Sequence, residues 1–171
     1  MEAEVKTKSD NYIQLKNENV VRFEIKDMDG VPTGDYLEFD LEDIELPLIY
    51  QDIIEEDKRN RTNLRNQLII IDKKQDHKGK KLLSSNEEEK IKAMNEFYKK
   101  EVETLNKFLG ENGVQKLLCG RKIGWTTLAE ISEIVDKVIA PKLNMTMDNI
   151  SKRIKEKYGN NLVKKEDNTL E

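Results

Sequence analysis

The stretch from Phe108 to Trp125 holds four of the eight glycines of this 171-residue chain, together with its only cysteine and its only tryptophan. Cys119 could serve as a nucleophile, because it stands close to Arg121 and cationic neighbours favour the reactive thiolate. A cysteine nucleophile also needs a positioned base, and the only histidine, His77, lies in a lysine-rich segment. We therefore interpret Cys119 as a small buried residue and His77 as a solvated residue of a connecting segment.

Two other patterns suggest ligand chemistry. A phosphate-binding loop has the spacing G-x-x-x-x-G-K-[ST] after a strand, whereas GENGVQKLLCG follows a predicted helix and lacks the Lys-Ser/Thr pair. Asp27, Asp29 and Asp35 in DMDGVPTGD suggest a calcium loop, but their spacing is not that of an EF-hand and a hairpin turn explains them better. The sequence therefore predicts a protein that is not an enzyme, with no catalytic residue, no cofactor and no metal site.

The composition indicates one domain with solvated helices and a modest core. Charged residues make up 37% and hydrophobic residues 36%, and the net charge of −4 argues against a dominant nucleic-acid surface. Two local basic clusters remain: Lys58, Arg59, Arg61 and Arg65, and then Lys73, Lys74, Lys78, Lys80 and Lys81. Because carboxylates interleave with them, we interpret both clusters as solvated faces and expect no nucleic-acid partner, although a small nucleic-acid-binding regulator stays an alternative.

Nothing in the sequence indicates a membrane or a secretion signal. No run approaches the roughly 18 apolar residues of a membrane-spanning helix, and the first residues, MEAEVKTKSDN, lack an apolar segment. The single cysteine also excludes an internal disulfide. We expect a cytoplasmic protein.

Alternation of apolar and charged residues in VVRFEIKD and YLEFDLED predicts two strands, and MDGVPTG between them predicts a turn. We predict an α+β fold, mainly α, with a flexible lead-in over residues 1–19 and a β-hairpin over 20–45. Residues 46–141 are predicted to form a small bundle of amphipathic helices, with a charged linker at 74–85. Residues 142–171 are predicted to form a short helix and a flexible, disordered tail.

The first predicted helix begins near Pro47, which fits a first helical turn. Apolar residues at helical spacing continue to Ile71, but the polar run EEDKRNRTN interrupts them. The segment is therefore either one long helix from about residue 46 to 73 or two helices with a break near Asn60. The run LIII at 68–71 favours a strand locally.

Serines define the start of the second helix. Ser84 and Ser85 precede Glu87 and Glu88 by three residues, which is the spacing of a capping box. We predict that this helix runs to about Leu109.

Two later helices have weaker signals. Thr127 and Glu130 have capping-box spacing, so we expect a helix that begins near Thr127 and stops at Pro141. Asp148 could cap a last helix.

The glycines between the helices are predicted to form joints. Gly110 stands where a helix C-cap needs positive φ, and Asn112-Gly113 is a typical turn pair. Gly120 could close a short helix over VQKLLC, and Gly124 lies in the bridge to the next helix. We predict Gly110, Gly113, Gly120 and Gly124 as helix joints.

The segment LNKFLGENGVQKLLCGRKIGWTTLAEISEIVDKVI resembles the C-terminal half of tail assembly chaperones of phages and phage-like elements from Gram-positive bacteria. That family has an FGEG segment, which Phe108-Leu109-Gly110-Glu111 matches with variation. It also has a KIFGG(R/K) segment, which Lys116–Lys122 matches with Cys119 in a glycine place. The hairpin before the helices agrees with the family layout.

The resemblance implies a function. Such chaperones bind the long tape measure protein in the bacterial host cytoplasm and keep it soluble while the tail assembles. It also implies a homo-oligomer, because several copies would hold one client, and it leaves a structural tail subunit, such as an initiator or connector, as an alternative. We expect the client to contact apolar residues of the helices, namely Phe97, Val102, Leu105, Leu128, Ile131 and Val135, or the hairpin face of Phe23, Ile25, Leu37 and Phe39. Most of these residues must fill the core, so only a subset is free for a partner.

Overall fold

The computed structural model describes residues 19–145 and residues 149, 152, 155 and 156. A β-hairpin precedes the helices, so the predicted α+β, mainly α, fold is confirmed. The elements in chain order are β1 (Val20–Lys26), β2 (Pro32–Asp40), α1 (Leu46–Asp72), α2 (Ser85–Leu109), α3 (Gly113–Leu118), α4 (Trp125–Ile134), the π-helical turn η1 (Val135–Ile139) and α5 (Ala140–Lys142). The predicted lead-in, the last helix at Asp148 and the tail lie largely outside the described residues.

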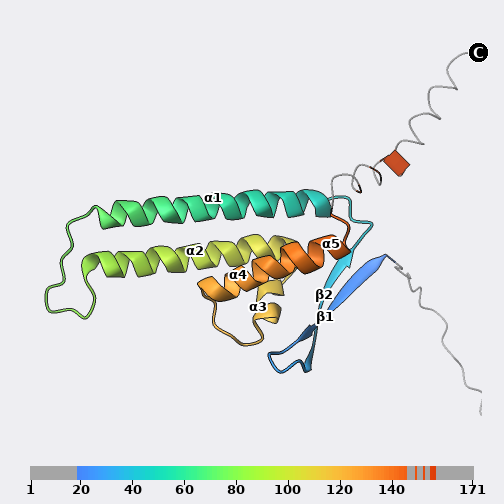
Figure 1. Ribbon diagram of the computed structural model, residues 1–171, viewed down its shortest axis with the longest axis horizontal. Helices are drawn as coiled ribbons and strands as arrows, with labels where there is room; N and C mark the ends of the chain where they lie inside the picture. The colour runs from blue at the N-terminus through green and yellow to red at the C-terminus, as the bar shows by residue number, and fades with distance from the viewer. Residues whose placement is uncertain (1–18, 146–148, 150–151, 153–154, 157–171) are drawn as a thin grey trace, which may run out of the picture.

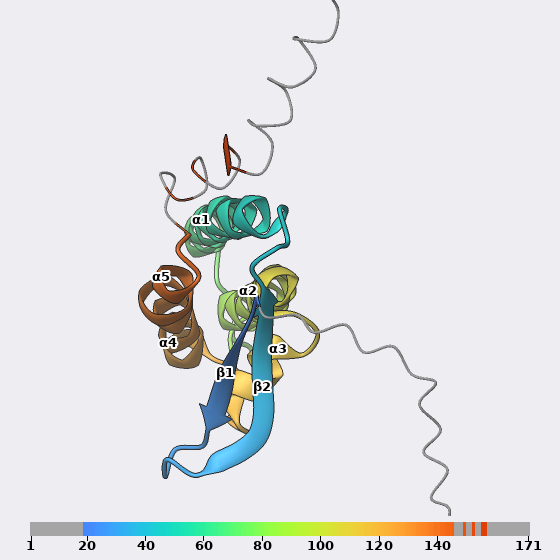
Figure 2. The same ribbon diagram turned by 90° about the vertical axis from the view of Figure 1, so that its right-hand side faces the viewer.

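Helices α1 and α2 lie antiparallel and side by side, and their connection is at the end farthest from the hairpin (Figure 1). The continuous helical segment α4–η1–α5 lies against this pair only at the hairpin end (Figure 1). The end-on view shows α5 beside α1 and α2 (Figure 2). Trp125, the first residue of α4, contacts Arg61 and Phe97. We call the part of the pair beyond this contact, residues 62–72 and 85–96, the arm.

The hairpin forms with the predicted alternation. Its antiparallel register places Val21 opposite Phe39 and Phe23 opposite Leu37, and the inward-pointing Ile25, Leu37 and Phe39 are buried. The outer face is polar. The two-stranded sheet therefore has one apolar face, which packs on the helices.

Phe108 of α2 joins the hairpin to the helices. Its ring centroid lies 5.2 Å from that of Phe39 on β2 and 5.3 Å from that of Tyr50 on α1. Tilted contacts between aromatic rings are favourable, and the Phe108 side chain is buried. One side chain thus holds three elements together.

Helix α1 is continuous, which settles the choice between one helix and two. Asn60 does not break it, because the side-chain amide of Asn60 points to α2 and donates to Oε1 of Glu101 at 2.8 Å. The LIII run is also helical, since Leu64 and Ile71 are buried and Leu68 packs on the same core. Tertiary packing therefore overrides the local strand preference.

The capping box at Ser84 is confirmed. The backbone N–H of Glu87 donates to the Ser84 hydroxyl at 3.3 Å, and the Ser84 N–H donates to the Glu87 carboxylate at 2.7 Å. The alternative box of Ser85 and Glu88 does not form, because the Ser85 hydroxyl instead accepts the N–H of His77. Helix α2 ends at Leu109 as predicted.

Helix α4 begins near Thr127 as predicted, but the predicted capping box of Thr127 and Glu130 is wrong. The helix begins at Trp125, and the Thr127 hydroxyl accepts the N–H of Gly124 at 2.9 Å. Glu130 does not cap the helix, because its carboxylate pairs with Arg121 at 2.7 Å. Thr127 therefore acts inside the first turn and not before it.

Pro141 does not stop the helix. The chain widens into the π-helical turn, in which the N–H of Ala140 donates to the carbonyl of Val135, and then continues through Lys142. Pro141 follows the π-helical turn directly, and the N–H of Leu143 donates to the carbonyl of Ile139 beyond it. The buried Leu143 follows this last turn.

Three predicted glycine joints have a conformational or steric basis. Gly110 ends α2 with φ of 83°, and Gly120 has φ of 80° directly after Cys119, the C-cap of α3. Gly113 begins α3 and is buried, and a Cβ placed there would lie 2.4 Å from the Cβ of Leu109. Gly124 differs, because its extended backbone and open surroundings accept any residue.

Replacing Gly113 by Ala should destabilise the fold, because the added methyl group meets the rigid Cβ of Leu109. We expect a loss of about 1–3 kcal/mol in the free energy of unfolding. The matched variant Gly124→Ala should change it by less than about 0.5 kcal/mol. Urea denaturation of both variants measures the difference, and equal values would contradict the close packing of α2 and α3.

Candidate protein-binding groove

The structure does not bring His77 and Cys119 together. His77 lies in the connection between α1 and α2 at the tip of the arm, whereas Cys119 ends α3 beside the hairpin (Figure 1). His77 is exposed as expected. Cys119 is half-buried, and its thiol donates to the carbonyl of Lys116 at 3.2 Å.

The acidic residues before β2 form a hairpin turn. The Asp27 carboxylate accepts the backbone N–H groups of Asp29 at 3.0 Å and Val31 at 2.8 Å, so it is occupied by the turn itself. Within residues 19–145 and the few described beyond them, no group of three His, Cys, Asp or Glu side chains is placed to hold a metal ion.

Both basic clusters lie among carboxylates. Ion pairs join Arg61 to Asp57, Lys74 to Glu89 and Lys81 to Glu88. Because the chain's own carboxylates pair with these cations, they weaken the positive field that a nucleic-acid phosphate backbone would meet. In the described part of the chain, no helix has the length and apolar run that a membrane crossing requires.

Trp125 lies at the surface where α4 meets the arm. Its ring is tilted against Phe97 with a centroid distance of 5.9 Å, and the Arg61 guanidinium lies 5.4 Å from the ring centre. The side chain is 50% exposed, so it covers the edge of the core and is not itself buried in it.

Most of the residues that the sequence predicts as a client surface belong to the core. Phe97, Leu105, Leu128, Ile131 and Val135 are buried. In this fold they hold the helices together, as expected for most of the set, so a partner cannot reach them. The same holds for Ile25, Leu37 and Phe39 of the hairpin.

Val102 and Phe23 are the exceptions, because both are half-buried, and Val102 lines an open groove of about 440 Å³. The groove lies between the outward face of α2 and the segment that connects α3 to α4. Its walls are formed by Asn95, Tyr98, Lys99, Val102 and Glu103 of α2 and by Ile123. The apolar members are half-buried, and charged side chains of both signs stand beside them.

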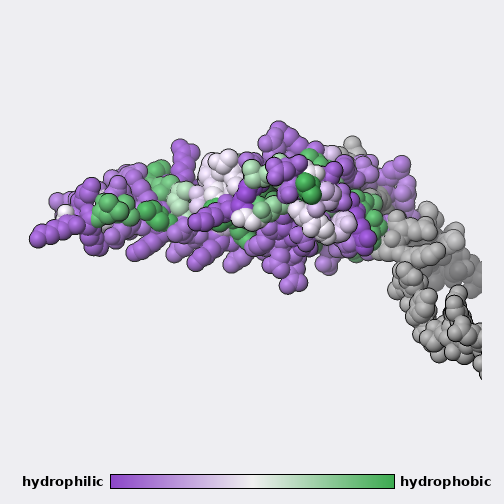
Figure 3. Space-filling view, turned by 90° about the horizontal axis from the view of Figure 1, so that it is seen from below, coloured by the Kyte–Doolittle hydropathy of each residue, from purple (hydrophilic) through white to green (hydrophobic). Residues whose placement is uncertain are grey.

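The apolar surface continues from the groove along α2 onto the arm. Ile91, Met94, Tyr98 and Val102 are spaced by three, four and four residues, which places them on one helical face over about 16 Å. Ile91 is 48% exposed, and the other three are half-buried. We call these four residues the α2 stripe. Figure 3 shows the setting on one face of the molecule: hydrophobic residues emerge in separate areas among hydrophilic ones, on the arm as well as at the compact end.

A buried carboxyl group between α1 and α2 is the feature that sequence reasoning missed. Glu101 is 1% exposed; it accepts a hydrogen bond from Asn60 and shares one with Asp57. Burial, followed by the hydrogen bond and negative charge of Asp57, raises the pKa of Glu101 to about 8. At neutral pH the carboxyl is therefore largely protonated and donates to Asp57. The sequence contained a signal for this cluster, because the apolar spacing of α1 and α2 places Asp57, Asn60 and Glu101 on the faces that the two helices turn toward each other.

Comparisons with protein-family models, with curated proteins and with solved structures find no match for this chain.

Replacing Glu101 by Gln should flatten the dependence of stability on pH. The pKa of Glu101 rises from 4.5 to about 8 on folding, so its contribution is complete below pH 4.5 and is lost as the pH rises through 8. Gln keeps both hydrogen bonds but does not titrate. Urea denaturation across this range should show a smaller fall in the free energy of unfolding for Glu101→Gln than for the natural chain.

Glu103→Gln provides the control, because Glu103 is exposed on the same helix and should leave the slope unchanged. Equal slopes for Glu101→Gln and the natural chain would contradict a protonated Glu101.

Proposed function

We propose that this chain binds amphipathic helices of a partner through the α2 stripe and the adjoining groove, and that it is a tail assembly chaperone whose client is the tape measure protein. The observation that carries this proposal is the groove of Tyr98, Val102 and Ile123, which continues into the exposed Ile91. It is a mostly apolar strip along one face of α2, with charged side chains beside it.

An amphipathic client helix fits such a surface. Apolar side chains at positions i, i+3 and i+4 of the client would enter the spaces between Met94, Tyr98 and Val102, and burial of these groups would supply the affinity. Lys99 and Glu103 stand on the flank of the groove, so opposite charges on the client would set its direction along α2. The many charges elsewhere would keep a loaded complex soluble.

The segment that resembles tail assembly chaperones builds one wall of the groove. After α2, the chain turns at Gly110, packs α3 closely through Gly113, and turns again at Gly120. This path brings Ile123 against the outward face of α2, beside Val102. The glycines thus support the proposed function indirectly, because they position an apolar wall.

Co-expression with the tape measure protein should raise the soluble yield of that protein, and the two should co-purify at high as well as low salt, because apolar burial is insensitive to screening. Val102→Lys combined with Ile123→Lys should reduce the co-purified amount about tenfold or more, since two buried charges would oppose the complex. Leu82→Lys is the matched control, because Leu82 is 89% exposed and lies outside the groove. It should bind as the natural chain does.

Three results would count against the proposal. The first is no association between the two proteins, and the second is undiminished binding by the groove variant with intact folding. The third is abundant chain in purified mature tails, which would favour a structural tail subunit. A nucleic-acid complex that dissociates steeply with salt would instead favour a regulator.

A further inference from the structure

The outer edge of β1 pairs with no other strand in the described part of the chain. Its sheet has only two strands. The carbonyl of Asn19 accepts the N–H of Leu41, and bonded pairs alternate along antiparallel strands. Val21 and Phe23 therefore direct their backbone groups to β2, whereas Arg22 and Glu24 direct their N–H and C=O groups to the other edge.

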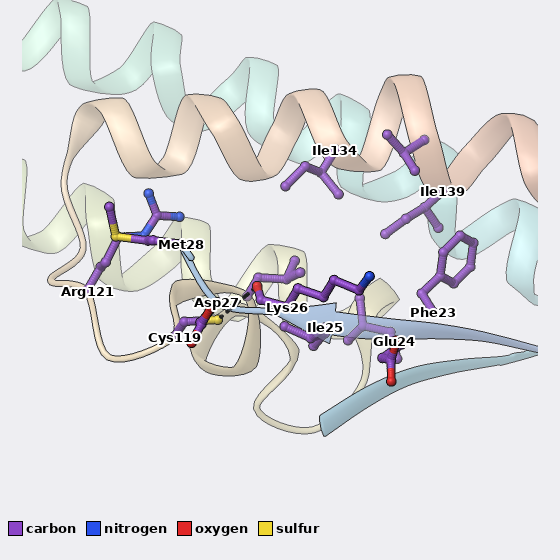
Figure 4. Close-up of a pocket in the computed structure, with 13 residues that line it drawn as sticks. Phe23, Glu24, Ile25, Lys26, Asp27, Met28, Cys119, Arg121, Ile134 and Ile139 are labelled. Atoms are coloured by element: carbon purple, nitrogen blue, oxygen red, sulfur yellow. Dashed lines mark hydrogen bonds between the residues drawn. The ribbon is translucent and has the colours of Figure 1, made fainter. Parts of the chain in front are cut away.

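This edge of β1 borders a second groove, of about 310 Å³. In Figure 4, Ile134 and Ile139 point from the helical segment toward the strand that carries Phe23 and Ile25. Val138 belongs to the same lining and is 42% exposed. An unpaired strand beside an open apolar surface is a site for strand addition.

We propose that a second copy of this chain docks here, with the two β1 strands antiparallel and centred on Phe23, so that two hairpins form one four-stranded sheet. The pattern of charges on the strand selects this occupant. With Phe23 at the centre, Arg22 lies directly opposite Glu24 of the second copy, and two-fold symmetry repeats the pair. Both residues direct their backbone groups to the shared edge, as a hydrogen-bonded pair requires.

Neighbouring registers lack this complementarity. A shift that centres the pairing on Arg22 places the two Arg22 side chains opposite each other, and a shift that centres it on Glu24 does the same for the two carboxylates. Like charges directly opposite are destabilising, so the charges specify one register. On the inner face the same register sets Val21 against Ile25 and Phe23 against Phe23, which extends the apolar face of the sheet.

The edge and the α2 stripe lie on different elements, so this dimer does not depend on the proposed chaperone function. Arg22 also pairs with Glu38 of its own hairpin. A charge reversal at Arg22 therefore needs a compensating change at Glu38 to leave the hairpin intact.

Sedimentation equilibrium of the full chain over a range of concentrations tests the dimer. The natural chain should form dimers. Glu24→Arg alone, and Arg22→Glu combined with Glu38→Arg, should each weaken self-association about tenfold or more, because two attractive pairs become repulsive. An equimolar mixture of these two variants should associate again, since each chain then offers the charge that the other lacks. Glu96→Arg, an exposed change on α2 outside the groove, should leave the dimer unchanged.

A monomeric natural chain would overturn the proposal, including the case in which the chain's own first residues cover the edge. So would dimers that persist in both variants, or a mixture of well-folded variants that stays monomeric. Hydrogen exchange gives a second measurement: the amides of Arg22 and Glu24 should become protected as the concentration rises, and protection that does not change with concentration would contradict strand pairing between copies.

Discussion

The packing of Phe108 between Phe39 and Tyr50 is the contact on which the arrangement of the chain depends. It fixes the C-terminal half of α2 between the hairpin and α1. The glycine joints that follow then turn the chain so that α4 covers one flank of the helix pair. Because α4 begins only at Trp125, the arm stays two helices thick and the outward face of α2 stays partly open. The α2 stripe therefore stays accessible because α4 does not extend along the whole length of α2.

The buried polar cluster between α1 and α2 complements that contact. A protonated Glu101 hydrogen-bonded to Asp57 and Asn60 satisfies its buried oxygens without placing an isolated charge in the core. In the described residues, no buried side-chain polar atom lacks a hydrogen-bond partner. Because a slipped pairing of the helices would leave such groups unpaired, the cluster favours one alignment of α1 with α2 over the neighbouring ones.

Local rules predicted the features that depend on few neighbours. The hairpin alternation, the Ser84 cap of α2 and the positive φ of Gly110 all follow from short-range geometry, and the structure confirms them. The errors arose where distant contacts decide. Arg121 takes Glu130 away from Thr127, and packing carries the helix through Pro141.

The site shows the same division. Periodicity identified the apolar face of each helix, but it could not tell core residues from surface residues. Only the fold shows that Leu105 and Ile131 are enclosed while Val102 lines a groove. The central claim, that the open face of α2 receives a client helix, is tested most directly by hydrogen exchange of this chain with and without the tape measure protein. Protection should increase over residues 91–103 and around Ile123. Protection confined to other segments, or no change in a verified complex, would contradict it.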